Sequence, residues 1–570
     1  MATTTATKRK QQQRQATIQL VFIAGIIVLL NILASLFHYG FDLTKEKRFS
    51  LSPATKNMLR NLKDVAVIDV YLKGDFPAGF QHLSDATKEC LQSFREYGGS
   101  HIIFRFTDPI KGKSQEEKMQ VYQDFAKRGI NPVNLRQQSR DAGYSEKVIF
   151  PDAVVHYNGR ELPVNLLDNH TGLSNGQVFS HSQSVMEYKF ANAIHKLSLP
   201  DLPHIAYVMG NGESLGLNTI DALTTLQNTY HLDTIDLAHI RQIPIAYDAI
   251  IFNKPTTPFS DPQKFAIDQY VMHGGHILWF VDMMHTPMDS LNHSEAFLSM
   301  DYGLNLDDIL FKYGVRINAD LIEDMHCALL PVMGQRGMEK RPWIYFPLFQ
   351  PTGTHPIIKN MDEVFSKFAS SIDTIANRDI KKTILLQSSQ YSRTANAPVR
   401  VSLSMMQYDL RPDMFKNPYR NAAVLLEGKF SSVFQNRLPV TTMHFLDSIH
   451  QPFKLKCDTA NSMIVVSDGD LISNDFTSKA GPMEMGYWQY TGEYFSNKSF
   501  MLNCMEYLTD HSGLLEARSK DLRIRQLDAG RVEDEKTKWQ LINIGLPIVL
   551  VLVFASCYIF FRKRRYERSA

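Results

Sequence analysis

The stretch DPQKFAIDQYVMHGGHILWFVD, from Asp261 to Asp282, decides the fold of the central part of this chain. Its first half has the composition of a helix, Gly274-Gly275 ends that helix, and HILWFVD is typical of a buried strand. Three further strands are predicted before it, with a helix between the first two, in the segments HIAYVMG (204–210), HLDTIDL (231–237) and YDAIIFN (247–253). Strands that alternate with helices indicate an α/β fold with an open, doubly wound, mostly parallel sheet.

A first α/β lobe is predicted at 38–200, ahead of this larger second lobe at 201–515. Its βαβ unit consists of VAVIDVYL (65–72), a helix, and HIIFRFTD (101–108), and a strand pair turning at Asn158-Gly159 follows. Ser52 and Pro53 have the residue types of a helix N-cap and of the first helical position. In the second lobe an insertion rich in Pro, Gly and Met is expected around 290–380, before strands resume.

Two long apolar runs lie near the ends of the chain, Ala16 to Phe37 and Leu541 to Phe561. Each is long enough to cross a hydrocarbon core of about 30 Å as a helix. The tails outside them, 1–15 and 562–570, are basic, and Lys and Arg favour the cytoplasmic side. We therefore expect a two-pass inner-membrane protein with both ends in the cytoplasm, a periplasmic two-lobed domain, and a charged connector at 516–540.

Both predicted spans contain amide side chains, namely Gln19, Asn31 and Asn543. An amide in hydrocarbon gains by hydrogen bonding to another helix, so these positions favour packing against partner helices. Two helices do not enclose a pore. If this protein serves transport, other subunits must supply the channel.

Composition excludes some partners. The 61 Lys and Arg residues nearly balance the 59 Asp and Glu residues, which leaves a net charge of +2 and no basic field for nucleic acid.

The cysteines are far apart and have no zinc-site spacing. Four of them could form disulfides in three alternative pairings, or they are small buried apolar residues; the five are Cys90, Cys327, Cys457, Cys504 and Cys557.

The nearest approach to a cofactor motif is the turn Gly210-Asn211-Gly212-Glu213 after the first strand of the second lobe, with Gly216 three residues later. The last glycine is one place late for the dinucleotide fingerprint. Asp233 and Asp236 lie where a ribose-binding acid would be expected. A tight strand-to-helix turn explains the same glycines, and we predict no bound cofactor but a candidate interaction turn here.

Asp468, Asp470 and Asp475 cluster after the strand SMIVVSDGD and are weak candidates for a divalent cation. Their spacing matches no calcium loop, and Asp-Gly is a common turn. His273 and His276 bracket Gly274-Gly275 but have no carboxylate or Cys partner nearby in sequence. No P-loop, Gly-x-Ser-x-Gly elbow or His-Glu-x-x-His motif occurs in the chain, so no catalytic residue is predicted.

Several strings resemble the auxiliary proteins of certain bacterial ABC transporters. They are KRFSLSPAT (47–55) directly after the predicted anchor, and the helix-Gly-Gly-strand unit at 261–282. NLDDILFKYGVRINADLI (305–322) and AVLLEGKFSSVFQNR (423–437) look like the gliding-motility branch of that family, GldG. The family pattern often has Gly-His-Gly-Glu at the turn, where this chain has Asn211 in place of the His.

The resemblance implies a second lobe similar to the class I glutamine amidotransferase fold without its catalytic residues. It also implies that the protein works with a separate ATPase and a multi-span permease. We therefore expect a non-enzymatic accessory, substrate-binding type of subunit in an ABC complex for gliding motility and its secretion, which contacts an envelope or motility protein. Two alternatives stay open at this point, a receptor for a sugar, lipid or peptide between the lobes, and an envelope-modifying enzyme built on the carboxylates near Asp468.

Overall fold

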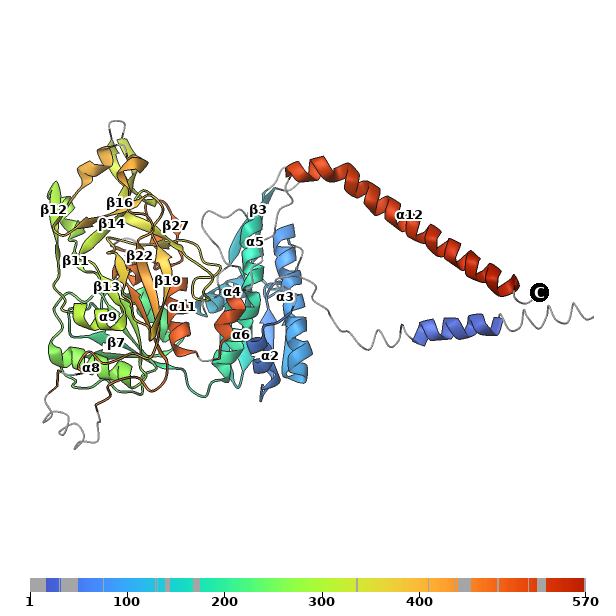
Figure 1. Ribbon diagram of the computed structural model, residues 1–570, viewed down its shortest axis with the longest axis horizontal. Helices are drawn as coiled ribbons and strands as arrows, with labels where there is room; N and C mark the ends of the chain where they lie inside the picture. The colour runs from blue at the N-terminus through green and yellow to red at the C-terminus, as the bar shows by residue number, and fades with distance from the viewer. Residues whose placement is uncertain are drawn as a thin grey trace, which may run out of the picture. The chain divides into compact units, whose positions relative to one another are not determined.

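The computed structural model describes residues 17–29, 31, 50–74, 76–128, 130, 132–138, 144–167, 175–334, 337–408, 410–435, 437–438, 453–478, 481–510, 512–519 and 529–567 (Figure 1). Its contacts divide the chain into two units, Met1–Asp521 and Leu522–Ala570. Both predicted lobes belong to the first unit.

The first lobe is built on a four-stranded sheet of order β2-β1-β5-β6, in which only β1 and β2 are parallel. Helices α2, α3, α5 and α6 pack against one another beside it (Figure 1). The elements of this lobe are α2 (Pro53–Arg60), β1 (Ala66–Val70), α3 (Ala78–Gly98), β2 (Ile102–Phe106), α4 (Gln115–Lys127), β3 (Val133–Gln138), β4 (Tyr144–Ile149), β5 (Asp152–Tyr157), β6 (Arg160–Asn165), α5 (Asn175–Ser184) and α6 (Met186–Ser198).

Local sequence explains where these elements begin and turn. The Ser52 hydroxyl accepts the Thr55 N–H at 3.2 Å, and Pro53 is the first residue of α2. Asn158 and Gly159 both have positive φ, 51° and 73°, which the tight turn between β5 and β6 requires. The predicted βαβ unit, the helix start and this turn are confirmed.

The second lobe is built on a ten-stranded sheet of order β15-β16-β19-β22-β23-β10-β9-β7-β8, with β17 paired to β16. Its main elements are β7 (His204–Met209), α7 (Ile220–Gln227), β8 (His231–Asp236), β9 (Ala249–Asn253), α8 (Asp261–Met272), β10 (His276–Phe280), β19 (Ile380–Gln387), β22 (Asn421–Gly428), β23 (Asn461–Val466) and α11 (Asn497–Thr509).

The prediction of a mostly parallel sheet is wrong for this lobe, because only half of the sheet is parallel. Strands β8, β7, β9, β10 and β23 run parallel, whereas β22, β19, β16 and β15 are antiparallel to their neighbours. Consecutive strands such as β22 and β23 can pair antiparallel without a crossover helix. A buried strand has the same apolar composition whether it runs parallel or antiparallel to its neighbours, so the sequence pattern did not distinguish parallel from antiparallel pairing.

Residues around 290–380, where an insertion was predicted, form mainly strands. β15 and β16 are a hairpin at one edge of the large sheet, and Trp343 and Phe346 of β16 belong to a separate apolar core. The elements from 284 to 402 are β11 (Met284–His285), β12 (Ala296–Asp301), α9 (Asp307–Tyr313), β13 (Val315–Ile317), β14 (Asp320–Asp324), β15 (Cys327–Gly334), β16 (Gly337–Pro351), β17 (Val364–Phe365), β18 (Ile372–Thr374), β20 (Ser392–Asn396) and β21 (Val399–Ser402).

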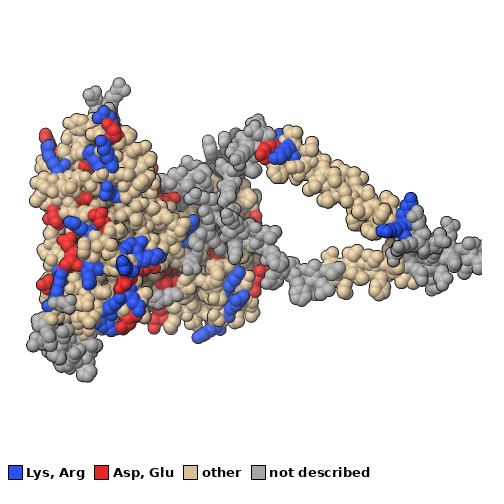
Figure 2. All heavy atoms as spheres, viewed as in Figure 1, with Lys and Arg blue, Asp and Glu red and all other residues tan. Residues whose placement is uncertain are grey.

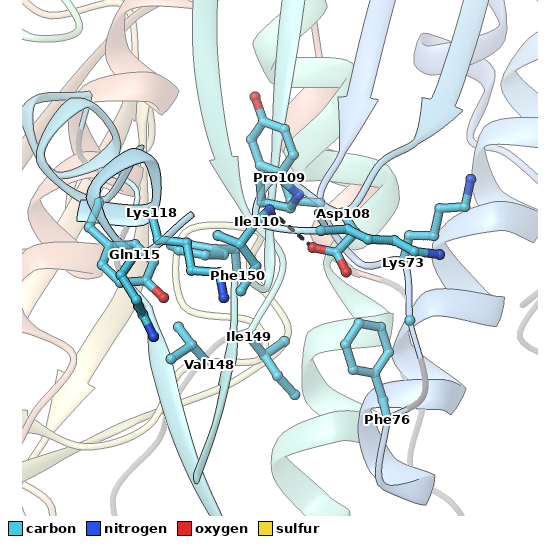
Figure 3. Close-up of a pocket in the computed structure, with 14 residues that line it drawn as sticks. Lys73, Phe76, Asp108, Pro109, Ile110, Gln115, Lys118, Val148, Ile149 and Phe150 are labelled. Carbon is cyan, nitrogen blue, oxygen red and sulfur yellow. Dashed lines mark hydrogen bonds between the residues drawn. The ribbon is translucent and has the colours of Figure 1, made fainter. Parts of the chain in front are cut away.

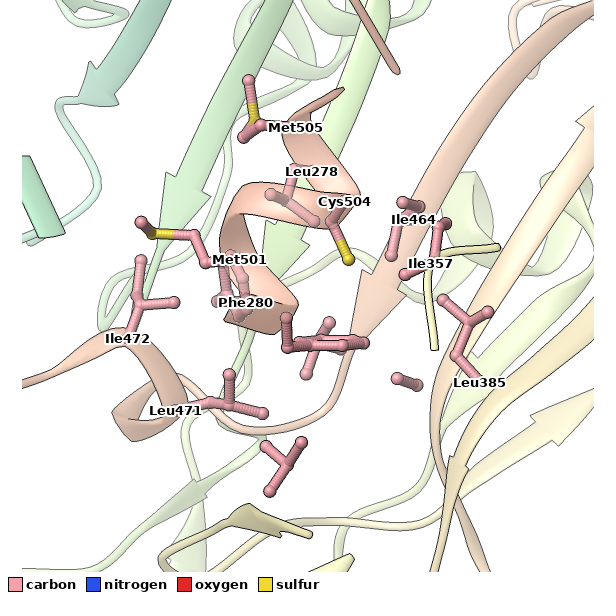
Figure 4. Close-up of a cluster of buried hydrophobic side chains, with 14 of the residues drawn as sticks. Leu278, Phe280, Ile357, Leu385, Ile464, Leu471, Ile472, Met501, Cys504 and Met505 are labelled. Atoms are coloured by element: carbon pink, nitrogen blue, oxygen red, sulfur yellow. The ribbon is translucent and has the colours of Figure 1, made fainter. Parts of the chain in front are cut away.

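Alternate residues of the parallel strands enter two different cores, one on each face of the sheet. In β10, Leu278 and Phe280 pack with α7 and α11, whereas Ile277 and Trp279 pack with α8 and α9. Figure 4 shows the first face, where Met501, Cys504 and Met505 of α11 lie over β10 and β23. Helices on both faces confirm the doubly wound arrangement.

A buried hydrogen-bond network joins the two lobes. The Glu506 carboxylate on α11 accepts the Tyr188 hydroxyl at 2.6 Å and the Asn192 amide at 3.0 Å, both from α6. The Arg518 guanidinium lies 5.3 Å from the centre of the Tyr188 ring. At this point of the junction, side chains of the two lobes therefore contact each other directly.

The second unit contains α12 (Ala529–Glu567), which carries the predicted C-terminal span. Among the described residues, Glu535–Arg564 is the one helix long and apolar enough to cross a membrane, and none of its apolar stretch is buried. Figure 2 shows its charged side chains only near the two ends. Of the predicted first span, 17–29 is an apolar helix too short to cross by itself, and most of the remainder lies outside the described residues.

All five cysteines are free thiols in the structure. Cys457 and Cys504 are buried in the cores of the second lobe, and Cys90 and Cys327 are half-buried. None of the three alternative disulfide pairings is therefore formed.

Candidate functional site

The parallel strands of the second lobe bring four polar residues to one edge of the sheet. Lys254 directly follows β9, while Asp282 and Asp468 come two residues after β10 and β23. Asp470 comes two residues after Asp468. In doubly wound sheets ligands bind at this carboxyl edge, near the place where the strand order reverses. The parallel strands have the order 2-1-3-4-5 in chain numbering, so the reversal lies between β7 and β9.

Lys254 joins two of the carboxylates in a charge network. Its Nζ lies 2.6 Å from Asp470 Oδ1 and 3.2 Å from Asp282 Oδ2. The Asp282 side chain is only 4% exposed, whereas that of Lys254 is 31% exposed. Asp282 Oδ1 also accepts the N–H of Gly469. The network therefore ties the ends of β9, β10 and β23 together.

Electrostatics in this network follow from burial and from the lysine. Burial opposes the charged form of Lys254, but attraction by Asp470 and Asp282 outweighs it and raises the Lys254 pKa. Burial raises the pKa of Asp282. Burial also raises the pKa of Asp468, and the neighbouring carboxylates of Asp282 and Asp470 add to the shift. Burial and mutual repulsion therefore oppose the ionisation of Asp282 and Asp468, whereas the carboxylates favour the charged form of Lys254.

Asp468 is fully buried, and main-chain donors occupy both of its oxygens. Oδ1 accepts the Asp470 N–H at 2.7 Å, and Oδ2 accepts the Lys367 N–H at 2.9 Å. This is the environment of a carboxylate that organises a loop. A carboxylate without exposed surface is poorly placed for the catalysis that the enzyme alternative assigned to it.

Close backbone approach explains two unusual residues here. Lys254 has a φ of +53°, in the left-handed region that side chains rarely adopt. A Cβ on Gly469 would lie 2.7 Å from Lys254 Cβ, so this position accepts only glycine without a shift. Strain of this kind persists where the surrounding contacts determine the conformation, and here the two ion pairs of Lys254 do so.

The predicted interaction turn, Gly210 to Glu213, follows β7 and is hydrogen-bonded to the segment that follows β9. The Asn211 carbonyl accepts the N–H groups of Thr256 and Thr257, at 2.8 and 3.0 Å, and the Asn211 side chain is 1% exposed. A Cβ on Gly212 would lie 2.0 Å from Thr256 Oγ1. Asn211 and Glu213 therefore point inward, and only the two glycines are exposed.

Glu213 is the residue of this turn with an unusual chemical environment. Its Oε2 accepts the Asn211 N–H at 2.7 Å, but among the described residues its buried Oε1 has no hydrogen-bond partner. Burial raises the pKa of Glu213 to about 7. Its charge therefore opposes folding above neutral pH.

This gives a testable pH dependence. An acid whose pKa is raised on folding costs stability as the pH rises through the window between the unfolded and folded pKa values, here about 4.3 to 7. Gln in place of Glu213 removes that charge and keeps an oxygen for the Asn211 N–H. We expect Glu213→Gln to be about 2 kcal/mol more stable than wild type at pH 8, and about equal at pH 5. Chemical denaturation at both values measures the difference, and an equal gap at both would contradict it.

The three metal candidates do not gather around one point. Asp470 pairs with Lys254, and Asp475 Oδ1 lies 2.7 Å from Lys367 Nζ. Within the part of the chain that the structure describes, no group of three or more His, Cys, Asp or Glu side chains is placed to hold a metal. Each of these carboxylates already has a protein donor.

The other residues singled out in the sequence are held by local contacts. His273 Nδ1 lies 2.7 Å from the Gln269 carbonyl oxygen, and His276 Nδ1 lies 3.2 Å from that of Ser462. Asp236 caps its own turn, since it accepts the Ala238 N–H at 2.8 Å. Asp233 lies on β8.

Sequence reasoning missed Lys254 and Asp282, the centre of the network. Each follows an apolar strand that was predicted correctly, and polar residues at such ends meet at one edge of a parallel sheet. That rule could have grouped them with Asp468. The order of the strands determines which of these residues form ion pairs, and that order was known only from the structure.

The fold and the exposed apolar helix α12 define a membrane-associated α/β protein. The family model described as "ABC-type uncharacterized transport system", an ABC transporter auxiliary family, matches residues 202–504, and the chain belongs to this family. A second model, a domain of unknown function (DUF7088), matches residues 45–156. The first match covers most of the second lobe, and the second covers the first lobe from α2 into β5.

Individual relatives add little beyond this. An uncharacterized protein of Borreliella burgdorferi is 20% identical over 553 residues, which covers 95% of this chain and 96% of the relative. Among solved structures, the mmIFT52 N-terminal domain has a TM-score of 0.30 at 11% identity, covering 54% of this chain and 97% of that one. An exo-β-1,4-mannosidase from an Opitutaceae bacterium has a TM-score of 0.20 at 10% identity, covering 71% and 47%. Scores this low carry no argument about fold or function.

Proposed function

We propose that this chain is a membrane-anchored, non-enzymatic accessory subunit of an ABC-type transport complex. The observation that carries the proposal is the family match over the second lobe. The fully exposed apolar helix α12 supports it, since such a surface needs a lipid or protein environment. A separate ATPase and a multi-span permease would supply the energy and the channel.

The finer parts of the proposal rest on sequence. The basic residues outside both apolar runs favour two passes, with both ends in the cytoplasm and the two-lobed domain in the periplasm of an inner membrane. The strings at 305–322 and 423–437 support a role in gliding motility and its secretion system. The large domain would contact an envelope or motility protein.

Asn543 offers a direct test of the helix packing that this function requires. It is the amide within the apolar part of α12, and interhelical hydrogen bonds from such residues contribute about 0.6–2 kcal/mol. We expect Asn543→Leu to lower the recovery of a multi-span permease with the tagged chain by about three- to tenfold.

The matched control is Ile544→Leu, one position along the same helix, which should leave recovery unchanged. Quantitative mass spectrometry after mild solubilisation measures both variants against wild type. Equal recovery with Asn543→Leu and Ile544→Leu would remove the role assigned to the amide.

A further inference from the structure

A cavity of about 590 Å³ opens in the first lobe, in a domain whose family has no known function. It lies where the parallel strands β1 and β2 end, because Tyr71 and Lys73 follow β1 and Asp108, Pro109 and Ile110 follow β2. This is the edge at which α/β sheets bind ligands. The volume falls within the range of about 300–1,000 Å³ typical of small-molecule sites.

The walls of the cavity come from three elements besides the sheet. Figure 3 shows Gln115 and Lys118 of α4 on one side and Phe76 on the other, with Val148 and Ile149 between them. Ile149 is buried, and Val148 packs on the small apolar core of Phe125 and its neighbours. The floor is therefore apolar and firmly held.

The rim is positively charged. Lys73, Lys111 and Lys118 all line the cavity, against the single carboxylate of Asp108. Among the described residues, none of the three lysine side chains has an ion-pair or hydrogen-bond partner. Asp108 Oδ1 is engaged locally, since it accepts the Ile110 N–H at 3.1 Å (Figure 3).

The two acidic residues at the start of α4, Glu116 and Glu117, do not line the cavity. Glu117 belongs to a capping box, in which its carboxylate accepts the Ser114 N–H at 2.7 Å. A lining with three lysines and one carboxylate favours a dianion over a monoanion, and an apolar floor favours a ligand with an apolar body.

We propose that this cavity binds a phosphate monoester on a small apolar group, with the phosphate held by Lys111, Lys118 and Lys73 and the apolar group on Phe76 and Val148. Such a group can come from a soluble metabolite or from the headgroup of an anionic lipid. The proposal does not depend on the transport assignment, because it concerns the first lobe alone.

Phenyl phosphate is the probe, and it is titrated into the full-length chain in phosphatidylcholine nanodiscs by isothermal calorimetry. Benzylammonium has a similar ring and the opposite charge, and inorganic phosphate lacks the ring. We expect phenyl phosphate to bind, benzylammonium not to bind, and inorganic phosphate to bind more weakly. No binding of phenyl phosphate, or equal binding of benzylammonium, overturns the proposal.

Variants locate the binding in this cavity. Lys111→Gln with Lys118→Gln should weaken phenyl phosphate binding about tenfold, because two charge contacts are lost. The matched control, Lys63→Gln with Lys127→Gln, removes two exposed lysines of the same lobe that do not line the cavity. An equal loss in both double variants would mean non-specific attraction and overturn the proposal.

Two further measurements test the contact with the apolar group of the ligand and distinguish a lipid headgroup from a soluble ester. Phe76→Ala should weaken phenyl phosphate about fivefold and leave inorganic phosphate unchanged, because only the ring contact is lost. Phosphatidic acid in the nanodisc should compete with phenyl phosphate if the natural ligand is a lipid headgroup, and should have no effect if it is a soluble ester. Loss of inorganic phosphate binding in Phe76→Ala would contradict the assigned orientation.

Discussion

Replacing Lys254 by Met should destabilise the large domain by about 2–4 kcal/mol. The substitution removes the cation that lies 2.6 Å from Asp470 and 3.2 Å from Asp282, whose side chain is 4% exposed. Breaking a fully buried pair by removing one partner costs about 3–5 kcal/mol, because a buried charge is left without compensation. The expected cost is lower here because the Lys254 side chain is 31% exposed.

The comparison is designed to isolate charge. Met has nearly the same length as Lys and is equally strained at a φ of +53°, so the backbone cost is unchanged. The control is Lys381→Met on β19, which removes an exposed ion pair with Glu427 in the same sheet. Exposed pairs contribute about 0–1 kcal/mol. Urea denaturation of both variants measures the difference.

The gap between Lys254→Met and wild type should shrink as the pH is lowered. Without the lysine, the pKa of Asp282 rises further, so protonation can neutralise the carboxylate at moderately acidic pH. The stabilisation by Lys254 is thus present while Asp282 is ionised and is lost as the pH falls through its titration. A variant as stable as wild type at pH 8 would show that the network does not hold the sheet edge.

The second large effect is expected at the junction of the lobes. Glu506→Leu leaves the buried Tyr188 hydroxyl without its acceptor at a position that is 5% exposed, whereas the half-buried Asn192 amide keeps the Tyr188 hydroxyl oxygen as an acceptor at 3.2 Å. Leaving one buried donor unpaired costs about 1–3 kcal/mol. We also expect faster proteolytic cleavage between α6 and β7, where the chain passes from one lobe to the other.

Glu506→Gln is the matched control, because its amide oxygen can still accept both bonds. It should lie within about 1 kcal/mol of wild type. Thermal unfolding and limited proteolysis test both variants. If Gln and Leu were equally destabilising, the charge of Glu506 rather than its acceptor role would hold the lobes together, and the Lys196 ammonium 3.7 Å away would be the relevant partner.

Much of the fold could be predicted because its elements have strong local patterns. The strand at 276–280 and the helix at 261–272 were recognised from an apolar run, a helical composition and the glycine pair that separates them. The same holds for α2 with its Ser52 cap. These features depend on neighbours in the sequence, so a single chain contains the information.

Contacts between distant residues could not be predicted in the same way. Asp268 on α8 is fully buried, where it accepts the Tyr313 hydroxyl at 2.9 Å and the Ser432 hydroxyl at 2.6 Å. Lys264 on the same helix is 2% exposed and lies 3.0 Å from Asp308. A helix with charged residues on several sides normally indicates solvent exposure, and here segments far along the chain cover it.

In the candidate site, too, local features could be predicted from the sequence and long-range contacts could not. The turn at Gly210 and the aspartates near Asp468 were identified because glycines and carboxylates after a strand are visible in the sequence. In the structure, Asn211 and Asp468 are buried and bonded to main-chain groups. Lys254 was missed because its partners are set by strand order, which brings β9, β10 and β23 together.

The most direct test of the accessory-subunit proposal is affinity purification of the tagged full-length chain from its native membranes in mild detergent, with quantitative mass spectrometry. We expect an ABC-type ATPase and a multi-span permease to be recovered in a fixed ratio to the chain, and that ratio to persist through a second purification step. Recovery of the folded chain without either protein would contradict the proposal.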